Sequence, residues 1–180
     1  MIISLCGFMG SGKSTLGRGL ASAYNCRFID LDDYIEAKWA MSVSAIFAKR
    51  GEEWFRNEEC ESLKEIVEEY TYLSSKEQYT LVLALGGGTV TYAPSAEVIK
   101  RETQCVYLQC PKSVLLERLM KNNSRRPLVA GKSEADMEAA IDDLMRRRES
   151  LYRECAKDIL PVEGKRMGEM LRYFSEKYGL

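Results

Sequence analysis

Short apolar runs alternate along the chain with longer segments in which apolar residues recur at helical spacing. Unbroken apolar runs are typical of strands buried on both faces, and the longer pattern is typical of amphipathic helices. Their alternation predicts a parallel sheet covered by helices on both faces. The predicted strands are Ile2–Cys6, Arg27–Ile29, Thr80–Leu85, Cys105–Leu108 and, with a weaker pattern, Asp158–Val162. The predicted helices are Lys13–Tyr24, Glu52–Tyr70, Ser95–Arg101, Lys112–Met120 and Ala135–Cys155.

Two connecting segments show neither pattern. Leu73–Tyr79 is a polar connection, and Lys121–Glu134 is rich in Asn, Ser, Gly and Arg. Loops longer than about 12 residues are usually functional or disordered. The length of 180 residues suits one globular domain, so we expect a single domain over residues 1–180 with the second segment as a mobile insertion.

The composition is that of a soluble globular protein, and its main constraint is the absence of histidine. Apolar residues make up 46% and charged residues 29%, which argues against a disordered chain or a fibre. The 26 basic and 27 acidic residues nearly cancel, so we expect no nucleic-acid partner. Without histidine, acid–base chemistry is left to carboxylates, Lys, Tyr or Cys, and His-based nucleophile pairs and metal sites are excluded.

The six cysteines and the N-terminal residues favour a cytoplasmic protein. The cysteines form no CxxC pair, and Cys6 and Cys105 lie within apolar runs, so we expect buried, reduced thiols. The first apolar stretch is too short for a signal peptide or a membrane span. We therefore expect a cytoplasmic location and no membrane partner.

The strongest functional motif is GFMGSGKS at residues 7–14. It matches G-x-x-x-x-G-K-[ST], follows a predicted strand and opens a predicted helix, which is the context of a phosphate-binding P-loop. Its glycines let backbone amides converge on phosphate oxygens, and the helix N-terminus adds a favourable dipole. Lys13 can reach the β- and γ-phosphates of a nucleotide, and the Ser14 hydroxyl can ligate Mg²⁺.

Two carboxylates, Asp30 and Asp32, follow the second predicted strand. At i and i+2 of a strand they would share one face, and at its carboxyl end they would face the phosphates held by the P-loop. One could support Mg²⁺, usually through water, and the other could accept the proton of a substrate hydroxyl. The alternative is an N-cap for a helix that begins near Tyr34, a role for which Asp33 is favoured over Asp32.

Three glycines, Gly86, Gly87 and Gly88, directly follow the third predicted strand. They would expose backbone N–H groups and allow a ligand to come close to the chain. The alternative is a plain turn, but a plain turn rarely needs three glycines. The glycines therefore indicate a second candidate ligand contact.

Two arginines, Arg56 and Arg148, fall on the apolar stripes of their predicted helices. A guanidinium on a core-facing stripe is costly unless it is paired. The pattern therefore indicates either an internal salt bridge, with Glu59 as a possible partner, or an anion site that lines a cleft. Helical phase alone favours the salt bridge. The neighbouring Arg146 and Arg147 point elsewhere and are expected in solvent.

The insertion at Asn122–Glu134 carries two adjacent basic residues, Arg125 and Arg126, before a proline. Basic residues on a mobile loop fit a lid that closes over polyphosphate and excludes water. Taken alone, this segment is better explained as a solvated basic loop. Beside a P-loop, the lid becomes a specific hypothesis.

Six segments are specific in their joint order and spacing: GFMGSGKST at 7–15, FIDLDDYIE at 28–36, IFAKRGEEWFRNEE at 46–59, LALGGGTV at 83–90, RPLVAG at 126–131 and RRRESLY at 146–152. They resemble the motifs of shikimate kinase, within the nucleoside-monophosphate-kinase-like P-loop group. The resemblance implies transfer of the γ-phosphoryl group of ATP to the 3-hydroxyl of shikimate, in aromatic amino-acid biosynthesis. It also implies a three-layer α/β P-loop fold, with a five-stranded parallel sheet of order 2-3-1-4-5, helices on both faces and a mobile lid.

The resemblance also implies a role for each candidate residue. Asp30 assists the metal, Asp32 is the best candidate for the catalytic base, and both core-phased arginines clamp a carboxylate through paired hydrogen bonds. The implied catalytic residues are Asp32, Lys13 and Arg126, and the implied metal ligands are Ser14 and Asp30. The implied ATP-binding residues are Gly10, Ser11, Gly12, Lys13, Ser14, Thr15 and Arg126. The implied substrate-binding residues are Asp32, Arg56, Gly86, Gly87, Gly88 and Arg148.

Larger segments also receive a role from the resemblance. Tyr34–Glu61 would form the substrate-binding region, and Asn122–Glu134 would form the lid. Arg118 lies near an adenine-contacting position of the family, and no adenine contact is assigned after Val162. The expected partners are ATP and shikimate, the expected cofactor is Mg²⁺, and the expected state is a monomer.

Two other functions remain open. A different small-molecule P-loop kinase, such as a gluconate or nucleoside-monophosphate kinase, would share the P-loop, but Arg56 and Arg148 beside the three glycines favour a small carboxylated polyol. A nucleotide-dependent switch or binding module would need no catalytic turnover. The sequence has no N-K-x-D guanine-reading motif, and the combination of Lys13, Asp30 and Asp32 argues against a domain without activity.

Overall fold

The computed structural model describes residues 1–76, 79–121 and 134–180. At its centre lies a five-stranded sheet whose paired strands are all parallel, in the order β2-β3-β1-β4-β5. This architecture confirms the predicted fold class and strand order. The strands are β1 (Ile2–Cys6), β2 (Arg27–Asp30), β3 (Leu81–Ala84), β4 (Gln104–Gln109) and β5 (Asp158–Pro161).

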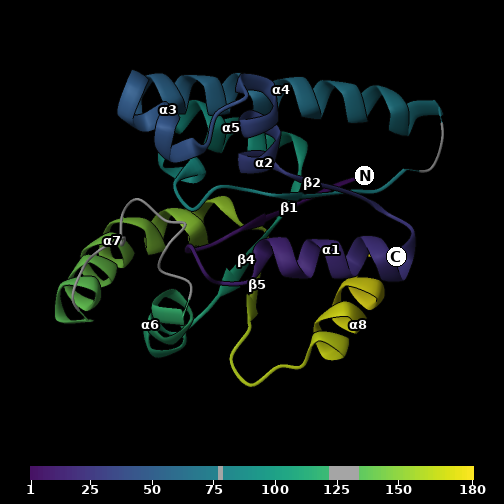
Figure 1. Ribbon diagram of the computed structural model, residues 1–180. Helices are drawn as coiled ribbons and strands as arrows, with labels where there is room; N and C mark the ends of the chain where they lie inside the picture. Colours follow the sequence, from purple (N-terminus) through teal and green to yellow (C-terminus); the bar gives the residue numbers. More distant parts are fainter. Residues whose placement is uncertain (77–78, 122–133) are drawn as a thin grey trace.

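Helices cover both faces of the sheet. In Figure 1, α2, α3, α4 and α5 lie on one side of it, and α1, α6 and α8 lie on the other. Within the described ranges, no helix is long and apolar enough to cross a membrane. The helices are α1 (Lys13–Tyr24), α2 (Leu31–Trp39), α3 (Val43–Arg50), α4 (Glu52–Lys76), α5 (Ala93–Glu102), α6 (Lys112–Lys121), α7 (Glu134–Cys155) and α8 (Met167–Tyr178), with a 3-10 turn η1 (Thr89–Thr91).

The parallel register brings the candidate motifs to one edge of the sheet. Every residue of β1 and β3 is buried, as expected for apolar runs in a sheet covered on both faces. Leu5 of β1 pairs with Ala84 of β3, and Ala84 pairs with Asp30 of β2. The P-loop, the acidic segment and the three glycines therefore leave adjacent strands at the same carboxyl edge, where ligands bind in open α/β sheets.

The cysteines belong to the apolar core. Cys6 of β1 and Cys105 of β4 are fully buried, together with Cys60, Cys110 and Cys155, while Cys26 is half-buried. All six are free, which confirms the expectation of thiols.

The structure corrects several predicted boundaries. The last strand ends one residue earlier than predicted, at Pro161. α4 continues to Lys76, so the expected polar connection Leu73–Tyr79 is helical over its first part. Residues 74–76 are Ser, Ser and Lys, and an apolar pattern cannot reveal a helical turn that has no apolar residues. The short helix α3 was not among the predicted elements.

Candidate active site

The loop between β1 and α1 has a backbone that only glycine adopts without strain. Gly7 has φ +140°, and a Cβ at this position would lie 2.8 Å from the carbonyl oxygen of Leu108. Gly12, the N-cap of α1, has φ +101°. Lys13 begins the helix with only 8% of its surface exposed, and its ammonium group donates to the carbonyl oxygens of Gly7 (2.9 Å) and Phe8 (3.1 Å). The P-loop prediction is thus matched by a loop that holds a buried cation at a helix N-terminus.

Asp30 links the P-loop helix to the start of α2. Its Oδ2 accepts a hydrogen bond from the Ser14 hydroxyl at 2.5 Å, and its Oδ1 caps α2 by accepting from the backbone N–H groups of Asp32 (3.1 Å) and Asp33 (3.5 Å). The expectation that Asp33 caps a helix beginning near Tyr34 is therefore wrong. The cap lies earlier because the strand ends at Asp30, whose extended backbone places its carboxylate over the first helical amides.

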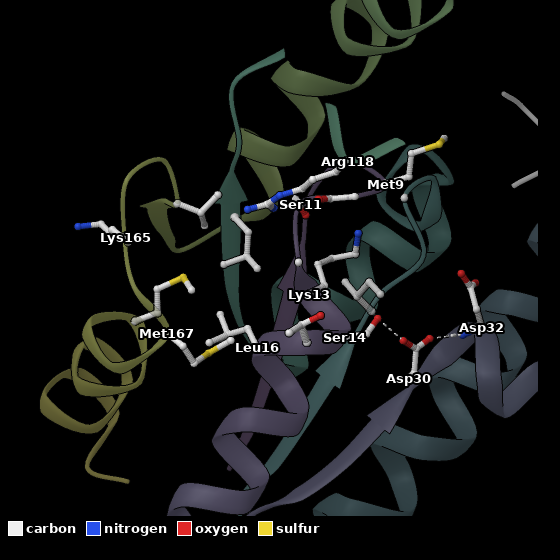
Figure 2. Close-up of a pocket in the computed structure, with 18 residues that line it drawn as sticks. Met9, Ser11, Lys13, Ser14, Leu16, Asp30, Asp32, Arg118, Lys165 and Met167 are labelled. Carbon is white, nitrogen blue, oxygen red and sulfur yellow. Dashed lines mark hydrogen bonds between the residues drawn. The ribbon is translucent and has the colours of Figure 1, made fainter. Parts of the chain in front are cut away.

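The placement of Asp32 also differs from the prediction. Asp32 belongs to the first turn of α2, so the two aspartates do not share one face of a strand. Both residues nevertheless line the same cavity. In Figure 2 the Asp32 carboxylate points away from Asp30, into the space that the Lys13 side chain enters from the other side. The expected convergence is confirmed, although a helical turn produces it.

The surroundings of Asp32 favour its protonated form. Burial, the Glu59 carboxylate and the Asp30 carboxylate, in that order, raise the pKa of Asp32 from 3.8 to about 7. The positive charges of Lys13 and Arg56 oppose this shift without cancelling it. Asp32 can therefore exchange a proton near neutral pH, which is the property a general base needs.

The oxygen atoms near the P-loop fit a Mg²⁺ ion that would be held jointly by the protein and a nucleotide. Magnesium in kinases commonly takes one or two carboxylates together with phosphate oxygens and water. Ser14 and Asp30 supply a hydroxyl and a carboxylate oxygen 2.5 Å apart, beside the helix N-terminus. Among the residues described, no group of three or more Cys, Asp or Glu side chains could hold a metal ion by itself.

Arg56 pairs with buried Glu59 beside the three glycines. Its Nη1 lies 2.7 Å from Glu59 Oε2, and its Nη2 lies 3.3 Å from the exposed carboxylate of Glu52. The guanidinium also packs against the strand end, because a Cβ on Gly88 would lie only 2.4 Å from Nη2. The internal salt bridge that helical phase favours is therefore present for Arg56.

Arg148 reaches the same glycine turn from α7. It is 8% exposed, and its Nη1 donates to the carbonyl oxygen of Gly87 at 3.1 Å. The Tyr152 hydroxyl, one turn further along α7, donates to the same carbonyl at 2.5 Å. Glu59 pairs with Arg56, and the bond of Arg148 instead goes to the chain that follows β3. The neighbours Arg146 and Arg147 are exposed, as predicted.

A cavity of about 530 Å³ joins the P-loop to the acidic segment. It extends on the opposite side to the chain that follows β5, where Figure 2 shows the Met167 side chain directed toward the P-loop residues and the Lys165 side chain directed away from them. Arg118 of α6 closes part of the wall, and its Nη1 donates to the carbonyl oxygen of Gly10 at 3.1 Å. The lining residues are Met9, Gly10, Ser11, Gly12, Lys13, Ser14, Thr15, Leu16, Asp30, Asp32, Leu85, Gly87, Leu108, Arg118, Val162, Lys165, Met167 and Met170.

Comparison with known proteins points to one family. The family model of shikimate kinase matches residues 9–178, nearly the whole chain. The chain belongs to the shikimate kinase family. Among relatives, the shikimate kinase of Dictyoglomus turgidum is 34% identical over 171 residues, which cover 93% of this chain and 91% of that protein. That of Chlorobium chlorochromatii is 35% identical over 181 residues, covering 98% and 90%.

Solved structures agree with this membership. Shikimate kinase from Acinetobacter baumannii, in complex with shikimate, superposes with a TM-score of 0.84 at 33% identity, over 97% of this chain and 90% of that chain. Shikimate kinase from Bacteroides thetaiotaomicron gives a TM-score of 0.88 at 30% identity, over 100% and 99%. The resemblance stated from the sequence motifs is thereby confirmed.

Most candidate residues of this shikimate kinase family member converge at the carboxyl edge of the sheet. The P-loop residues, both aspartates and Gly87 line the cavity, while Arg148 donates to the Gly87 carbonyl oxygen and Arg56 lies against Gly88. Arg125 and Arg126, with the expected lid up to residue 133, lie outside the described residues. The functional roles of all these residues stay predictions.

Two parts of the site were missed by the sequence analysis. The chain after β5 was given no nucleotide contact, yet Val162, Lys165, Met167 and Met170 line the cavity. These residues carry no motif, and apolar side chains with one lysine give no sign of a ligand. Glu59 was named only as a possible partner of an arginine, although it is fully buried at the centre of the polar contacts. The sequence does not show that the Glu59 side chain is buried, so its central position could not be predicted.

Proposed function

We infer that this chain transfers the γ-phosphoryl group of ATP to the 3-hydroxyl of shikimate, giving shikimate 3-phosphate and ADP in aromatic amino-acid biosynthesis. The observation that supports this function best is the position of Asp32. Asp32 lines the same cavity as the P-loop. Its carboxylate and that of Glu59 both lie close to Gly86, and Glu59 pairs with the guanidinium of Arg56. A phosphate donor and a carboxylated acceptor would therefore meet at this carboxylate.

The P-loop supplies the phosphate-binding half of the proposed reaction. Gly10, Gly12 and the start of α1 direct backbone amides at the phosphates, and Lys13 neutralises charge on the β- and γ-phosphates. Ser14 and Asp30 would hold Mg²⁺, Ser14 directly and Asp30 directly or through water. The chemistry that the ion would supply there is positive charge, which stabilises the negative charge that develops during transfer.

The acidic segment and the glycine turn supply the acceptor half. Asp32 accepts the proton of the 3-hydroxyl as the hydroxyl oxygen of shikimate attacks the γ-phosphorus of ATP, and the leaving group is ADP. Arg56 and Arg148 bind the carboxylate of the acid, with hydrogen bonds that only a planar guanidinium can pair. Gly86, Gly87 and Gly88 leave room for the ring of the substrate beside the backbone.

The remaining assignments belong to the same proposal. Arg126 would approach the phosphates from the lid and, with the lid, would exclude water from the transfer. ATP is the co-substrate, Mg²⁺ is the cofactor, and the protein acts as a cytoplasmic monomer without nucleic-acid or membrane partners. Ser11 and Thr15 complete the ATP-binding set.

A coupled assay of ADP release tests this function. The rate of ADP release by the full chain with Mg²⁺ and ATP is measured in the presence of shikimate, quinate, gluconate, AMP or no acceptor. We expect release that depends on shikimate. Release only with another acceptor would keep the kinase class but overturn the carboxylate site, and slow release that ignores every acceptor would favour a nucleotide switch.

A further inference from the structure

Thr89, the first residue of η1, lies at the centre of the polar contacts beside the candidate acceptor site. Its side chain is fully buried, and its Oγ1 lies 2.6 Å from Glu59 Oε1 and 3.1 Å from the carbonyl oxygen of Gly86. A carboxylate has two acceptor oxygens and attracts a donor more strongly than a carbonyl does. The hydroxyl proton therefore goes to Glu59 across the shorter contact.

The two oxygens of the Glu59 carboxylate thus have separate donors. Thr89 holds Oε1, and the guanidinium of Arg56 holds Oε2 at 2.7 Å. Glu59 is 0% exposed, so water cannot readily replace a lost donor. The carboxylate also has little room to turn, because a Cβ on Gly86 would lie 2.6 Å from its Oε1.

The orientation of Arg56 depends on the same contacts. Its guanidinium is confined between Glu59 and the backbone of Gly88, where an added Cβ would lie 2.4 Å from Nη2. With Nη1 bound to Glu59 and Nη2 3.3 Å from Glu52, the guanidinium has a fixed orientation beside the glycine turn. A shift of the Glu59 carboxylate would therefore turn Arg56 as well.

We propose that Thr89 is a positioning residue for the acceptor site: it fixes Glu59, and Glu59 fixes the Arg56 guanidinium that binds the carboxylate of the acid. This inference rests on the proposed function of Arg56. Because Thr89 directly follows the three glycines, its hydroxyl also links the turn after β3 to Glu59 on α4, and Glu59 in turn pairs with Arg56. The two parts of the acceptor site are thus held in one geometry.

Steady-state kinetics of Thr89→Val tests this role, since valine keeps the shape of threonine and removes the donor. We expect the KM for shikimate to rise about tenfold and the KM for ATP to stay within about twofold, because the lost bond orders only the acceptor side. Thr89→Ser, which restores a hydroxyl, is expected to recover most of the loss. If the valine variant does not fold, Thr89→Ala makes the same comparison with a smaller side chain.

A matched control separates positioning from stability. Thr103 is as deeply buried and is also hydrogen-bonded, to Ser4 and to the Ile99 carbonyl oxygen, but it lies at the opposite end of the sheet. We expect Thr103→Val to lower the melting temperature and to leave the KM for shikimate unchanged. Introduced into Glu59→Gln, Thr89→Val is expected to add less than about a twofold change, because coupled residues are not additive.

Three outcomes would overturn the role of Thr89. One is an unchanged KM for shikimate in folded Thr89→Val, and another is an equal rise of both KM values. The third is a full additional effect of Thr89→Val in the Glu59→Gln background. A wild-type chain without shikimate-dependent ADP release would instead refute the proposed function, so the two failures are distinguishable.

Discussion

The carboxylates of Asp32 and Glu59 approach Gly86 on the same side, at the position that a Cβ would occupy. A Cβ on that glycine would lie 3.0 Å from Asp32 Oδ1 and 2.6 Å from Glu59 Oε1, so only glycine leaves room for both groups. Glu59 pairs with Arg56 and accepts a hydrogen bond from the Thr89 hydroxyl, whereas burial and the Glu59 carboxylate raise the pKa of Asp32 to about 7. The pair thus combines a fixed structural carboxylate with a second one that is able to exchange a proton.

Replacement of Asp32 by asparagine tests its role as the base. We expect Asp32→Asn to lower kcat by at least about 100-fold, the usual scale for a lost general base, while the dissociation constant for ATP changes little. Turnover and nucleotide titration measure the two quantities. The control is Asp33→Asn, because Asp33 is exposed and pairs with Arg18 at the surface at 3.1 Å. Near-normal turnover in Asp32→Asn would remove this residue from the proton transfer.

The stability of the protein without metal or nucleotide should depend on pH through the protonation of Asp32. Its pKa is about 7 in the folded state against an ordinary value of 3.8, so between these pH values the folded state holds a proton that the unfolded state has released. The Asp32 contribution to the free energy of unfolding therefore decreases as pH rises from about 4 to about 7, by up to about 3 kcal/mol.

Denaturant unfolding of the wild type and of Asp32→Asn at several pH values measures this contribution. Because the variant cannot bind the proton, its stability relative to the wild type should increase as pH rises through this window and then level off above about pH 7. A constant difference between pH 4 and pH 8 would show that the pKa of Asp32 is not raised.

Arg148 should act on the acid and not on the nucleotide. Lysine keeps the charge but cannot offer two parallel N–H groups, so Arg148→Lys is expected to raise the KM for shikimate about tenfold or more and the KM for ATP less. Arg147→Lys is the matched control, since Arg147 is exposed and pairs with Asp143 on the helix surface. Equal effects of Arg148→Lys on both KM values would mean that Arg148 is structural.

Two helical glycines should respond in opposite ways to alanine. A Cβ on Gly17 of α1 would lie 2.2 Å from the ring of Phe28, whereas one on Gly168 of α8 has nothing within 4 Å. We expect Gly17→Ala to reduce the free energy of unfolding by about 1–3 kcal/mol through overpacking. Gly168→Ala should increase it by up to about 1 kcal/mol, because alanine favours the helix. Thermal and denaturant unfolding compare them, and a stable Gly17→Ala would mean that Phe28 can move away.

The sequence by itself determined the elements whose chemistry is local. Unbroken apolar runs identified the central strands β1, β3 and β4, because a strand buried on both faces must be apolar at consecutive positions. The edge strands β2 and β5 are less buried, and their runs are shorter or weaker. The P-loop was identifiable because its backbone needs glycine at fixed positions, as Gly7 and Gly12 confirm with φ values of +140° and +101°. The order of the strands came from the family resemblance, since apolar runs do not state which strands are neighbours.

The tertiary structure decided what depends on residues far apart in the chain. Helical phase placed Arg56 on a core-facing stripe, but only packing showed that its Nη1 binds buried Glu59 and that Arg148 binds the Gly87 carbonyl oxygen. The same holds for the chain after β5, whose apolar side chains reach the P-loop cavity only because α8 packs on α1. Burial, pKa and shared cavities arise from the sum of distant contacts, and no local pattern in the sequence records that sum.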